Sequence, residues 1–371
     1  MEGIGIMAKP LMIIAAGGTG GHMFPASAFA TEMKSRGWDV GLISDVRGLS
    51  YADQFPADWK LEVEAASPNL RRPWTLLSIL LKLWAGQAMA LRRFKQQRPT
   101  FVAGFGGYPA YPALGAAKRL GIPIIVHEQN AVLGRVNRVF SRAASIVASG
   151  FSRLDLLPAG LSHLTVGNPV RPSVVEVAGT AYPDPGEMLR VFITGGSQGA
   201  RILGDVIPEA ISIHLDASLR SRLNVVQQVR PEQIEQVAAV YERAGIRADL
   251  RPFFDDMPEQ IARSHLVIAR SGAGTVSEIA AIGRPSLLIP LKIAMNNHQT
   301  ANAEGLRDLG AAEIFAEDGL TADVLGTRLS RLLPDSTKLQ DMAAAAGKAG
   351  RLNAASVLAD AVENMLNAVA D

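Results

Sequence analysis

The chain of 371 residues has the length of about two domains of ordinary size. Its 37 Lys and Arg residues nearly balance its 35 Asp and Glu residues, which argues against a protein that coats nucleic acid through bulk charge. The absence of cysteine excludes disulfide scaffolds, thiolate metal sites and cysteine nucleophiles. Residues 1–10 lack the apolar core of a secretory signal, and the longest apolar stretch, 74–91, falls short of the roughly 20 residues of a membrane span.

Short apolar runs alternate with helical patterns along the whole chain, which is typical of an α/β fold with parallel sheets. In the first half we expect strands at 11–16, 40–43, 101–103, 124–126 and 146–148, and in the second half at 189–193, 225–228, 266–269 and 287–291. The expected helices are 25–36, 74–96, 112–120, 232–244, 275–282, 299–309 and 353–370. The stretch 343–350 consists mostly of residues with small side chains and is expected to be flexible.

A strand followed by a glycine-rich turn occurs twice, as LMIIAAGGTGGH at 11–22 and as LRVFITGGSQGA at 189–200. This long-range repeat predicts two Rossmann-like domains in tandem. Because prolines concentrate within 166–185, we expect the domains to be 1–168 and 169–349. The final amphipathic helix, within 350–371, is expected to return to the first domain.

The first glycine-rich turn, GGTGGH, ends at His22 and directly follows a predicted buried strand. Glycines allow a ligand to approach the backbone closely, and the start of the following helix attracts a phosphate. A tight turn without a ligand is the alternative. His22 itself is either a general base at the mouth of a site or the residue that caps the N-terminus of the helix.

Two more segments follow strands in the first half: GFGGYP at 104–109 and HEQN at 127–130. The carboxyl ends of parallel strands face one crevice, where ligands of open α/β sheets bind. Two glycine-rich turns at one edge of the sheet favour a binding site for a diphosphate over the alternative of two turns with unrelated roles. Four consecutive polar residues at 127–130 suit contact with a ligand, although a loop with an Asn turn remains the alternative.

In the second half, GGSQG at 195–199 also satisfies the G-x-S-x-G pattern of serine hydrolases. No oxyanion segment of the HGGG type accompanies it, so phosphate binding is preferred. The segment RSGAGTVSE at 270–278 predicts a turn and a helix that starts near Thr275. At that place Glu278 can accept hydrogen bonds from ribose hydroxyls. The alternative is that its negative charge only interacts favourably with the positive end of the helix dipole.

The chain contains no Asp-x-Asp and no His-Glu-x-x-His, so no metal site is expected. A diphosphate leaving group would then depend on helix dipoles and on an arginine, for which Arg171 in GNPVR stands at the domain boundary.

Seven strings resemble, in order, those of the bacterial cell-wall glucosaminyltransferases that convert lipid I to lipid II. They are GGTGGH, GFGGYPAYP, HEQN, GNPVR, GGSQGAR, RSGAGTVSE and HQTANA, and they span 17–303. The resemblance implies an α/β protein with two Rossmann-like domains facing a cleft (GT-B architecture). It implies that the donor is UDP-N-acetylglucosamine, bound by the C-terminal half, and that the acceptor is lipid I, bound by the N-terminal half. No cofactor is expected besides this donor substrate.

The resemblance also assigns site residues by matching position. Those expected at the donor are Thr19, Gly20, Gly21, Asn130, Arg171, Ser197, Phe254, Ala273, Gly274, Thr275, Glu278, His298 and Gln299. Those expected at the acceptor are Gly18, Gly106, Gly107, Tyr108, His127 and Asn130, with Gly20 and Gly21 beside them. His22 is implied as the base of an inverting transfer to the muramoyl 4-hydroxyl. Asn296 and Asn297 stand where the family often has Asp, which questions a charge-based role there.

Two other readings stay open: a UDP-sugar epimerase or hydrolase with the same two domains, and a nucleotide-binding protein of the membrane surface. The helix predicted at 74–96 carries Leu76, Leu77, Ile79, Leu80, Leu83 and Trp84, among the basic residues Arg71, Arg72, Lys82, Arg92, Arg93, Lys95 and Arg98. Such a helix lies in a membrane interface, or else its leucines pack on the sheet. With an undecaprenyl-linked acceptor, we expect peripheral binding to an anionic, cytoplasmic membrane face, together with a cell-wall synthesis complex.

Overall fold

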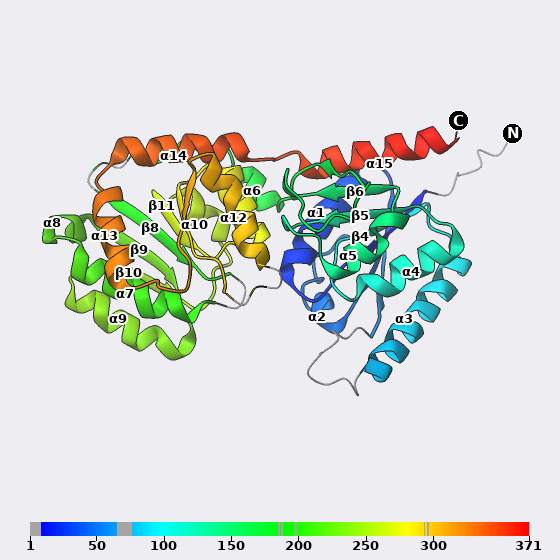
Figure 1. Ribbon diagram of the computed structural model, residues 1–371, viewed down its shortest axis with the longest axis horizontal. Coiled ribbons are helices and arrows are strands. Elements are labelled where there is room, and N and C mark those ends of the chain that lie inside the picture. The colour runs from blue at the N-terminus through cyan, green and yellow to red at the C-terminus, as the bar shows by residue number, and fades with distance from the viewer. Residues whose placement is uncertain are drawn as a thin grey trace, which may run out of the picture. The chain divides into compact units, whose positions relative to one another are not determined.

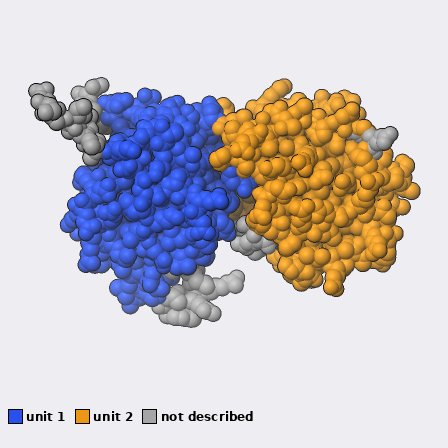
Figure 2. Space-filling model, turned by 180° about the vertical axis from the view of Figure 1, so that it is seen from behind, with its two compact units in different colours: residues 1–171, 353–371 blue, residues 172–352 orange. Residues whose placement is uncertain are grey.

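The computed structural model of the protein describes residues 9–64, 76–184, 186, 188–196, 199–292, 294 and 297–370. It divides into two compact units, Met1–Arg171 with Asn353–Asp371 and Pro172–Leu352 (Figure 2). The sequence placed these divisions at 168 and 349. Each unit is a parallel sheet between helices, the Rossmann-like arrangement that the repeat predicted (Figure 1).

The first unit contains a seven-stranded sheet in the order β3-β2-β1-β4-β5-β6-β7, in which all the described neighbouring strands are parallel. Its strands are β1 (Leu11–Ala15), β2 (Asp39–Ser44), β3 (Trp59–Glu62), β4 (Phe101–Gly104), β5 (Ile124–Glu128), β6 (Ile146–Ser149) and β7 (Leu164–Thr165). Its helices are α1 (Gly20–Ser35), α2 (Val46–Leu49), α3 (Leu76–Gln96), α4 (Ala110–Leu120), α5 (Arg135–Phe140) and α15 (Ala354–Ala370).

The second unit contains a six-stranded parallel sheet in the order β10-β9-β8-β11-β12-β13. Its strands are β8 (Leu189–Thr194), β9 (Leu223–Gln228), β10 (Arg247–Arg251), β11 (Leu266–Ala269), β12 (Ser286–Leu288) and β13 (Ala312–Ile314). Its helices are α6 (Pro172–Val177), α7 (Arg201–His214), α8 (Ala217–Arg222), α9 (Ile234–Arg243), α10 (Met257–Ala262), α11 (Ala273–Ile282), α12 (His298–Asp308), α13 (Ala322–Leu332) and α14 (Ser336–Ala349).

Apolar side chains leave both faces of the first sheet and form two cores. Met12 and Ile14 of β1 point to the core beneath α1 and α15, whereas Leu11 and Ile13 point to the core beneath α3 and α4. The alternation follows from the two-residue period of a strand. Because both faces of β1 are covered, the strand is apolar throughout, and its carboxyl end is held rigidly.

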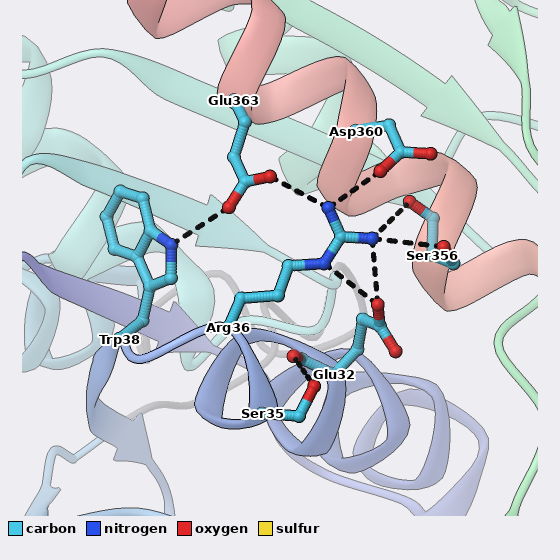
Figure 3. A network of polar contacts seen from close by, with 7 residues as sticks. All are labelled: Glu32, Ser35, Arg36, Trp38, Ser356, Asp360 and Glu363. Atoms are coloured by element: carbon cyan, nitrogen blue, oxygen red, sulfur yellow. Dashed lines mark hydrogen bonds and ion pairs between the residues drawn. The ribbon is translucent and has the colours of Figure 1, made fainter.

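The C-terminal helix α15 is fixed to α1 by a network around Arg36 (Figure 3). The guanidinium donates to Asp360 at 2.6 Å and to Glu363 at 2.7 Å on α15, and to Glu32 at 2.8 Å on its own helix. Trp38 Nε1 donates to the other oxygen of Glu363 at 3.2 Å. The chain therefore returns to its first unit, as the amphipathic pattern of the last helix predicted.

Several expectations for the elements were wrong, among them the strand expected at 287–291, which ends at Leu288. Helix α1 begins at Gly20 rather than at Pro25, so that Pro25 lies inside the helix as its sixth residue. Residues 343–349 are helical, as part of α14, because Ala343 and Ala346 pack into the core instead of forming a flexible stretch. The strands β3, β7, β10 and β13 were missed, since edge strands this short and polar lack the apolar run used to find the others.

Candidate functional site

The glycine-rich turns occupy equivalent positions in the two units. The strand order reverses between β1 and β4 in the first sheet and between β8 and β11 in the second. Ligands of open α/β sheets bind outside the carboxyl ends of the strands at such a reversal. Gly17 and Gly106 follow β1 and β4, and Gly195 and Gly272 follow β8 and β11. The fold thus brings together the turns that the sequence singled out within each half.

The two turns of the first unit interlock. A Cβ on Gly17 would lie 2.6 Å from Pro109 Cγ, and one on Gly107 would lie 2.7 Å from the Gly17 carbonyl oxygen. Gly107 also has a φ of +77°, which disfavours any other residue. The fold itself therefore requires Gly17 and Gly107, whatever binds beside them.

Asp45, which the sequence analysis missed, organises the first turn. It follows β2 and is 6% exposed, and its Oδ1 accepts hydrogen bonds from the Gly18 and Gly48 amides, each at 2.9 Å. Arg47 donates to its Oδ2 at 3.3 Å. The sequence did contain a signal for Asp45, because this carboxylate follows a predicted strand just as the two glycine-rich turns do.

His22 is the third residue of α1, so it is not the residue that caps the helix; that position belongs to Thr19. Its Nδ1 lies 2.9 Å from the Gly17 carbonyl oxygen, which can only accept a hydrogen bond, so Nδ1 carries a proton. In the neutral ring Nε2 is then the acceptor. A Cβ on Gly106 would lie 3.3 Å from this Nε2, so glycine at 106 leaves room at the reactive edge of the ring.

His127 lies inside the unit and does not line its surface. The ring is 1% exposed and stacks on Phe105 with the centroids 5.1 Å apart. Its Nε2 lies 3.0 Å from the Gly167 carbonyl oxygen, and its Nδ1 lies 3.0 Å from Nε2 of Gln129. Burial lowers the pKa of His127 to about 4, against the opposing effect of the bond to Gly167. His127 therefore supports the loop as a neutral ring, and its expected contact with the acceptor stays a prediction.

Glu128 is also used inside the fold. Its two oxygens accept from the Asn130 amide nitrogens at 3.1 and 3.0 Å, from the Gly134 amide at 2.9 Å and from Asn137 Nδ2 at 2.8 Å. The carboxylate therefore shapes the HEQN loop and holds the half-buried Asn130 side chain at its rim. Of the four residues 127–130, Asn130 alone is not fully buried.

The guanidinium carbon of Arg171 lies 5.0 Å from the centroid of the Phe24 ring. This contact places Arg171 beside the first turn. Phe24 in turn packs against Gly20, where a Cβ would lie 2.8 Å from the ring. The residues Thr19 and Gly21 are exposed at the start of α1, and Tyr108 is half-buried on the second turn. The first unit thus gathers all its expected site residues except the buried His127 around one edge of the sheet.

In the second unit the GGSQG turn is held from the neighbouring strand. The side-chain oxygen of Gln228 accepts from the Gly195 amide at 2.9 Å, and its Nε2 donates to the Gly196 carbonyl at 3.0 Å. Arg230 packs against Gly199, where a Cβ would lie 3.4 Å from its Cγ. Neither side chain was predicted from the sequence, although Gln228 ends a predicted strand and Arg230 follows it by two residues. Ser197 lies outside the described residues.

The start of α11 is open. Cβ atoms placed on Gly272 and Gly274 would meet no protein atom within 4 Å, and neither residue has a positive φ. No contact or strain within the described residues therefore requires glycine at these two positions, unlike Gly17 and Gly107. A helix start with this space around its N–H groups suits a phosphate that approaches the backbone.

Helix α11 begins at Ala273, two residues earlier than expected, so Glu278 is its sixth residue and not part of its first turn. This distance weakens the alternative that Glu278 serves only the helix dipole. Its side chain is 6% exposed. A buried carboxylate gains strongly from hydroxyl donors, which is the role that a ribose would satisfy.

A second set of contacts fixes the turn before α11 and the loop before α12. Arg270 donates to the Ile289 and Pro290 carbonyls at 3.0 and 3.1 Å and to Glu317 at 2.8 Å. Burial would raise the pKa of Glu317, but the bonds from Arg270 and from the Lys292 amide lower it overall. Gln299 lies in the first turn of α12, next to His298, and its Oε1 accepts from the Leu291 amide at 2.9 Å.

The remaining expected residues lie at the same edge of the second sheet or outside the description. Phe254 follows β10, and its ring is buried against Phe192 at 5.4 Å, so only its backbone is suited to meet a ligand. Asn296 lies outside the described residues, and Asn297 precedes α12 with a φ of +54°. Among the described residues there is no group of three or more His, Asp or Glu that could hold a metal ion.

Helix α3 presents an apolar surface, formed by Leu77, Leu80, Leu81 and Trp84, whose exposed fractions are 61–73%. Ile79 is buried and Leu83 is half-buried, so these two of the predicted interface residues face the protein instead. The side chain of Leu76, with Arg71 and Arg72, falls outside the description. None of the helices in the described parts of the chain has the length and hydropathy to cross a bilayer.

Comparison with protein-family models finds the glycosyltransferase family 28 N-terminal domain at residues 12–149 and its C-terminal domain at residues 190–361. A curated relative from Maricaulis maris (strain MCS10) is 46% identical over 358 residues, which cover 95% of this chain and 97% of the relative. It is named UDP-N-acetylglucosamine–N-acetylmuramyl-(pentapeptide) pyrophosphoryl-undecaprenol N-acetylglucosamine transferase.

Among solved structures, that of MurG from Acinetobacter baumannii superposes with a TM-score of 0.78 at 31% identity, covering 96% of this chain and 99% of that one. A UDP-GlcNAc 2-epimerase from Neisseria meningitidis, bound to UDP-GlcNAc, superposes with a TM-score of 0.68 at 13% identity over 96% of this chain and 100% of the other. At this identity the second likeness shows the shared fold alone.

Proposed function

The chain belongs to glycosyltransferase family 28, and from that premise we propose that it transfers N-acetylglucosamine from UDP-N-acetylglucosamine to the muramoyl sugar of lipid I, which gives lipid II. The observation that carries the proposal is the match at 46% identity over 95% of the chain to a relative named for this transfer. The architecture agrees, because both units present glycine-rich turns where their strand orders reverse.

We assign the donor to the second unit. The N-terminus of α11, at Ala273, Gly274 and Thr275, would hold the diphosphate, and its dipole would stabilise charge that develops on UDP as it leaves. The space beside Gly272 and Gly274 supports this assignment. Glu278 would accept from the ribose, the Phe254 backbone would meet uracil, and His298 and Gln299 would meet the sugar and phosphates.

We assign the acceptor to the first unit, around Gly18, Gly106, Gly107, Tyr108 and Asn130. Here Nε2 of His22 would take the proton from the 4-hydroxyl as the oxygen attacks C1 of N-acetylglucosamine. Attack from the side opposite UDP inverts that carbon. Arg171, Thr19, Gly20 and Gly21 are assigned as further contacts of the donor, since the stacking on Phe24 places the Arg171 guanidinium beside this turn.

Transfer of radiolabelled N-acetylglucosamine from UDP to a lipid I analogue tests the proposal directly. We expect turnover in excess EDTA, because helix dipoles and arginines would stabilise the leaving group without a metal ion. Release of UDP without labelled lipid would favour a hydrolase, and formation of a second UDP-sugar would favour an epimerase. Turnover that stops in EDTA and returns with magnesium would contradict the metal-independent account.

Donor binding is expected to depend on Glu278. Replacing it with alanine removes a charged acceptor of ribose hydroxyls, which should weaken UDP binding by about 1.5–3 kcal/mol. Calorimetric titration of Glu278→Ala with UDP measures the loss. The matched control is Glu313→Ala, which instead breaks an ion pair with Arg328. Equal UDP affinity in wild type and Glu278→Ala would remove Glu278 from the ribose role.

We propose further that the protein binds an anionic membrane surface through the exposed apolar face of α3. Leu77, Leu80, Leu81 and Trp84 lie on a helix whose last turn carries Arg93 and Lys95. Such amphipathic helices lie in the interface, with apolar side chains among the lipid tails and basic ones at the headgroups. The acceptor supports this surface, because its undecaprenyl chain stays in the bilayer. The exposed leucines argue against the alternative that this face packs on the sheet.

Replacing Leu80 and Trp84 together with glutamate is expected to reduce binding to phosphatidylglycerol vesicles by at least about 10-fold, since both side chains would leave the lipid. Co-sedimentation measures the bound fraction. Ile213→Glu changes an equally exposed apolar residue, 67% accessible on α7, and should leave binding unchanged. Undiminished binding by the folded double variant would place the membrane contact elsewhere.

A further inference from the structure

A single amide side chain, that of Gln228, joins two loops of the second unit. It stands at the end of β9 and is 6% exposed. Its Oε1 accepts from Thr194 Oγ1 at 3.1 Å and from the Gly195 amide at 2.9 Å. Its Nε2 donates to the Gly196 carbonyl at 3.0 Å and to the Pro252 carbonyl at 3.1 Å. The partners of all four bonds lie outside β9, the strand that carries Gln228.

The orientation of this amide is determined by its neighbours. An amide offers two N–H donors and an oxygen with two acceptor positions, and here each is used. Turning the group over would point its N–H groups at the Gly195 N–H and its oxygen at two carbonyl oxygens. Thr194 Oγ1 reinforces the arrangement, because it also accepts from the Gly196 amide at 3.2 Å.

The two loops that Gln228 joins are not neighbours in the sheet. Gly195 and Gly196 begin the turn after β8, whereas Pro252 follows β10 and leads to Phe254. Strand β9 lies between β8 and β10, so no ladder of backbone hydrogen bonds connects the two loops. Gln228, on the middle strand, bonds to both of them.

We infer that Gln228 is a positioning residue for the nucleotide: its bonds hold Gly195 and Gly196, which begin the GGSQG turn, in place relative to Pro252, which leads to Phe254. This inference rests on the proposed function and on two contacts expected there: that of the Phe254 backbone with uracil, and that of the GGSQG turn, through Ser197, with the diphosphate. Gln228 itself does not contact the ligand. It acts by keeping both loops in place before UDP binds, so that binding does not have to order them.

The isosteric variant Gln228→Glu tests the inference. It keeps the size of the side chain but replaces the two N–H donors with an oxygen that faces the Gly196 and Pro252 carbonyls. We expect UDP affinity to fall at least about 10-fold. The donor KM should rise by a similar factor while the acceptor KM stays unchanged, since the acceptor is assigned to the other unit.

The adjacent residue provides a matched control. Gln227 is 0% exposed on the opposite face of β9, where its amide donates to the Leu203 carbonyl and accepts from Tyr241 Oη. Gln227→Glu therefore buries the same carboxyl group in the same strand, away from the two loops. Gln227→Glu should change UDP affinity by less than about 3-fold, even though a buried carboxyl group at either position lowers the melting temperature.

Three results would overturn the inference. The first is a UDP affinity of Gln228→Glu within about 3-fold of wild type. The second is a loss of UDP affinity in Gln227→Glu as large as that in Gln228→Glu. The third is an acceptor KM of Gln228→Glu that rises together with its donor KM. Gln228→Met, which deletes all four bonds at similar length, decides the matter if Gln228→Glu does not fold. Failure of the wild-type protein to bind UDP would instead refute the proposed function.

Discussion

Replacing His22 with alanine is expected to lower kcat by about 10²–10⁴-fold while leaving the affinity for UDP within about 2-fold of wild type. The bond from Nδ1–H to the Gly17 carbonyl presents Nε2 as a proton acceptor. Removing the ring removes the base, whereas the residues assigned to the donor, including Thr19, Gly20, Gly21 and Arg171 of this unit, stay unchanged. Transfer to a lipid I analogue at saturating donor measures kcat, and calorimetry measures UDP affinity.

His214→Ala is the control for this experiment, because that histidine bonds to Asp323 on the outside of the second unit. It should change neither quantity. A His22→Ala rate within a few-fold of wild type would show that another group is the base. Glu128 is a poor substitute, since both its oxygens already accept hydrogen bonds within its loop. Loss of UDP binding in His22→Ala would show that this side chain contributes to the donor site.

The fold could be predicted where the sheet is buried on both faces. Strand β11 was predicted to the residue, and β1, β4 and β8 within one residue, because each is a continuous apolar run between polar turns. At the sheet edges this signal vanishes. Strand β10, RADLR, is polar along its length and has no fully buried residue, so its pairing with β9 is visible only in the structure.

The site could be predicted only in part, for a different reason. Glycine-rich strings mark turns, but they do not distinguish glycines that the fold needs from glycines that leave space for a ligand. Gly107 belongs to the first kind and Gly274 to the second, and the difference lies in atoms distant along the chain. Asp45 and Gln228 were missed for the same reason, since their partners lie 27 and 33 residues away.

His127 shows how burial changes the state of a residue that the sequence placed among the expected site residues. Its pKa falls from the ordinary 6.5 to about 4, chiefly because burial penalises the charged ring. In the unfolded chain the ring is hydrated and titrates near its ordinary value. Between these two values the unfolded state therefore binds more protons than the folded state, so the stability of the first unit rises with pH.

The first unit should lose stability as the pH falls from about 6.5 toward 4, by about 2 kcal/mol at pH 5 and about 3 kcal/mol at pH 4 from His127 alone. All four tryptophans, at positions 38, 59, 74 and 84, belong to this unit, so their fluorescence during urea unfolding reports on it. His127→Gln removes the titrating ring, and the difference between the two pH curves isolates its contribution from that of the carboxylates. We expect the variant to be less stable at pH 7.5 and the gap to narrow steadily below pH 6.5. Parallel curves would mean that the His127 ring is protonated equally in both states, and that it does not hold the loop as a neutral group.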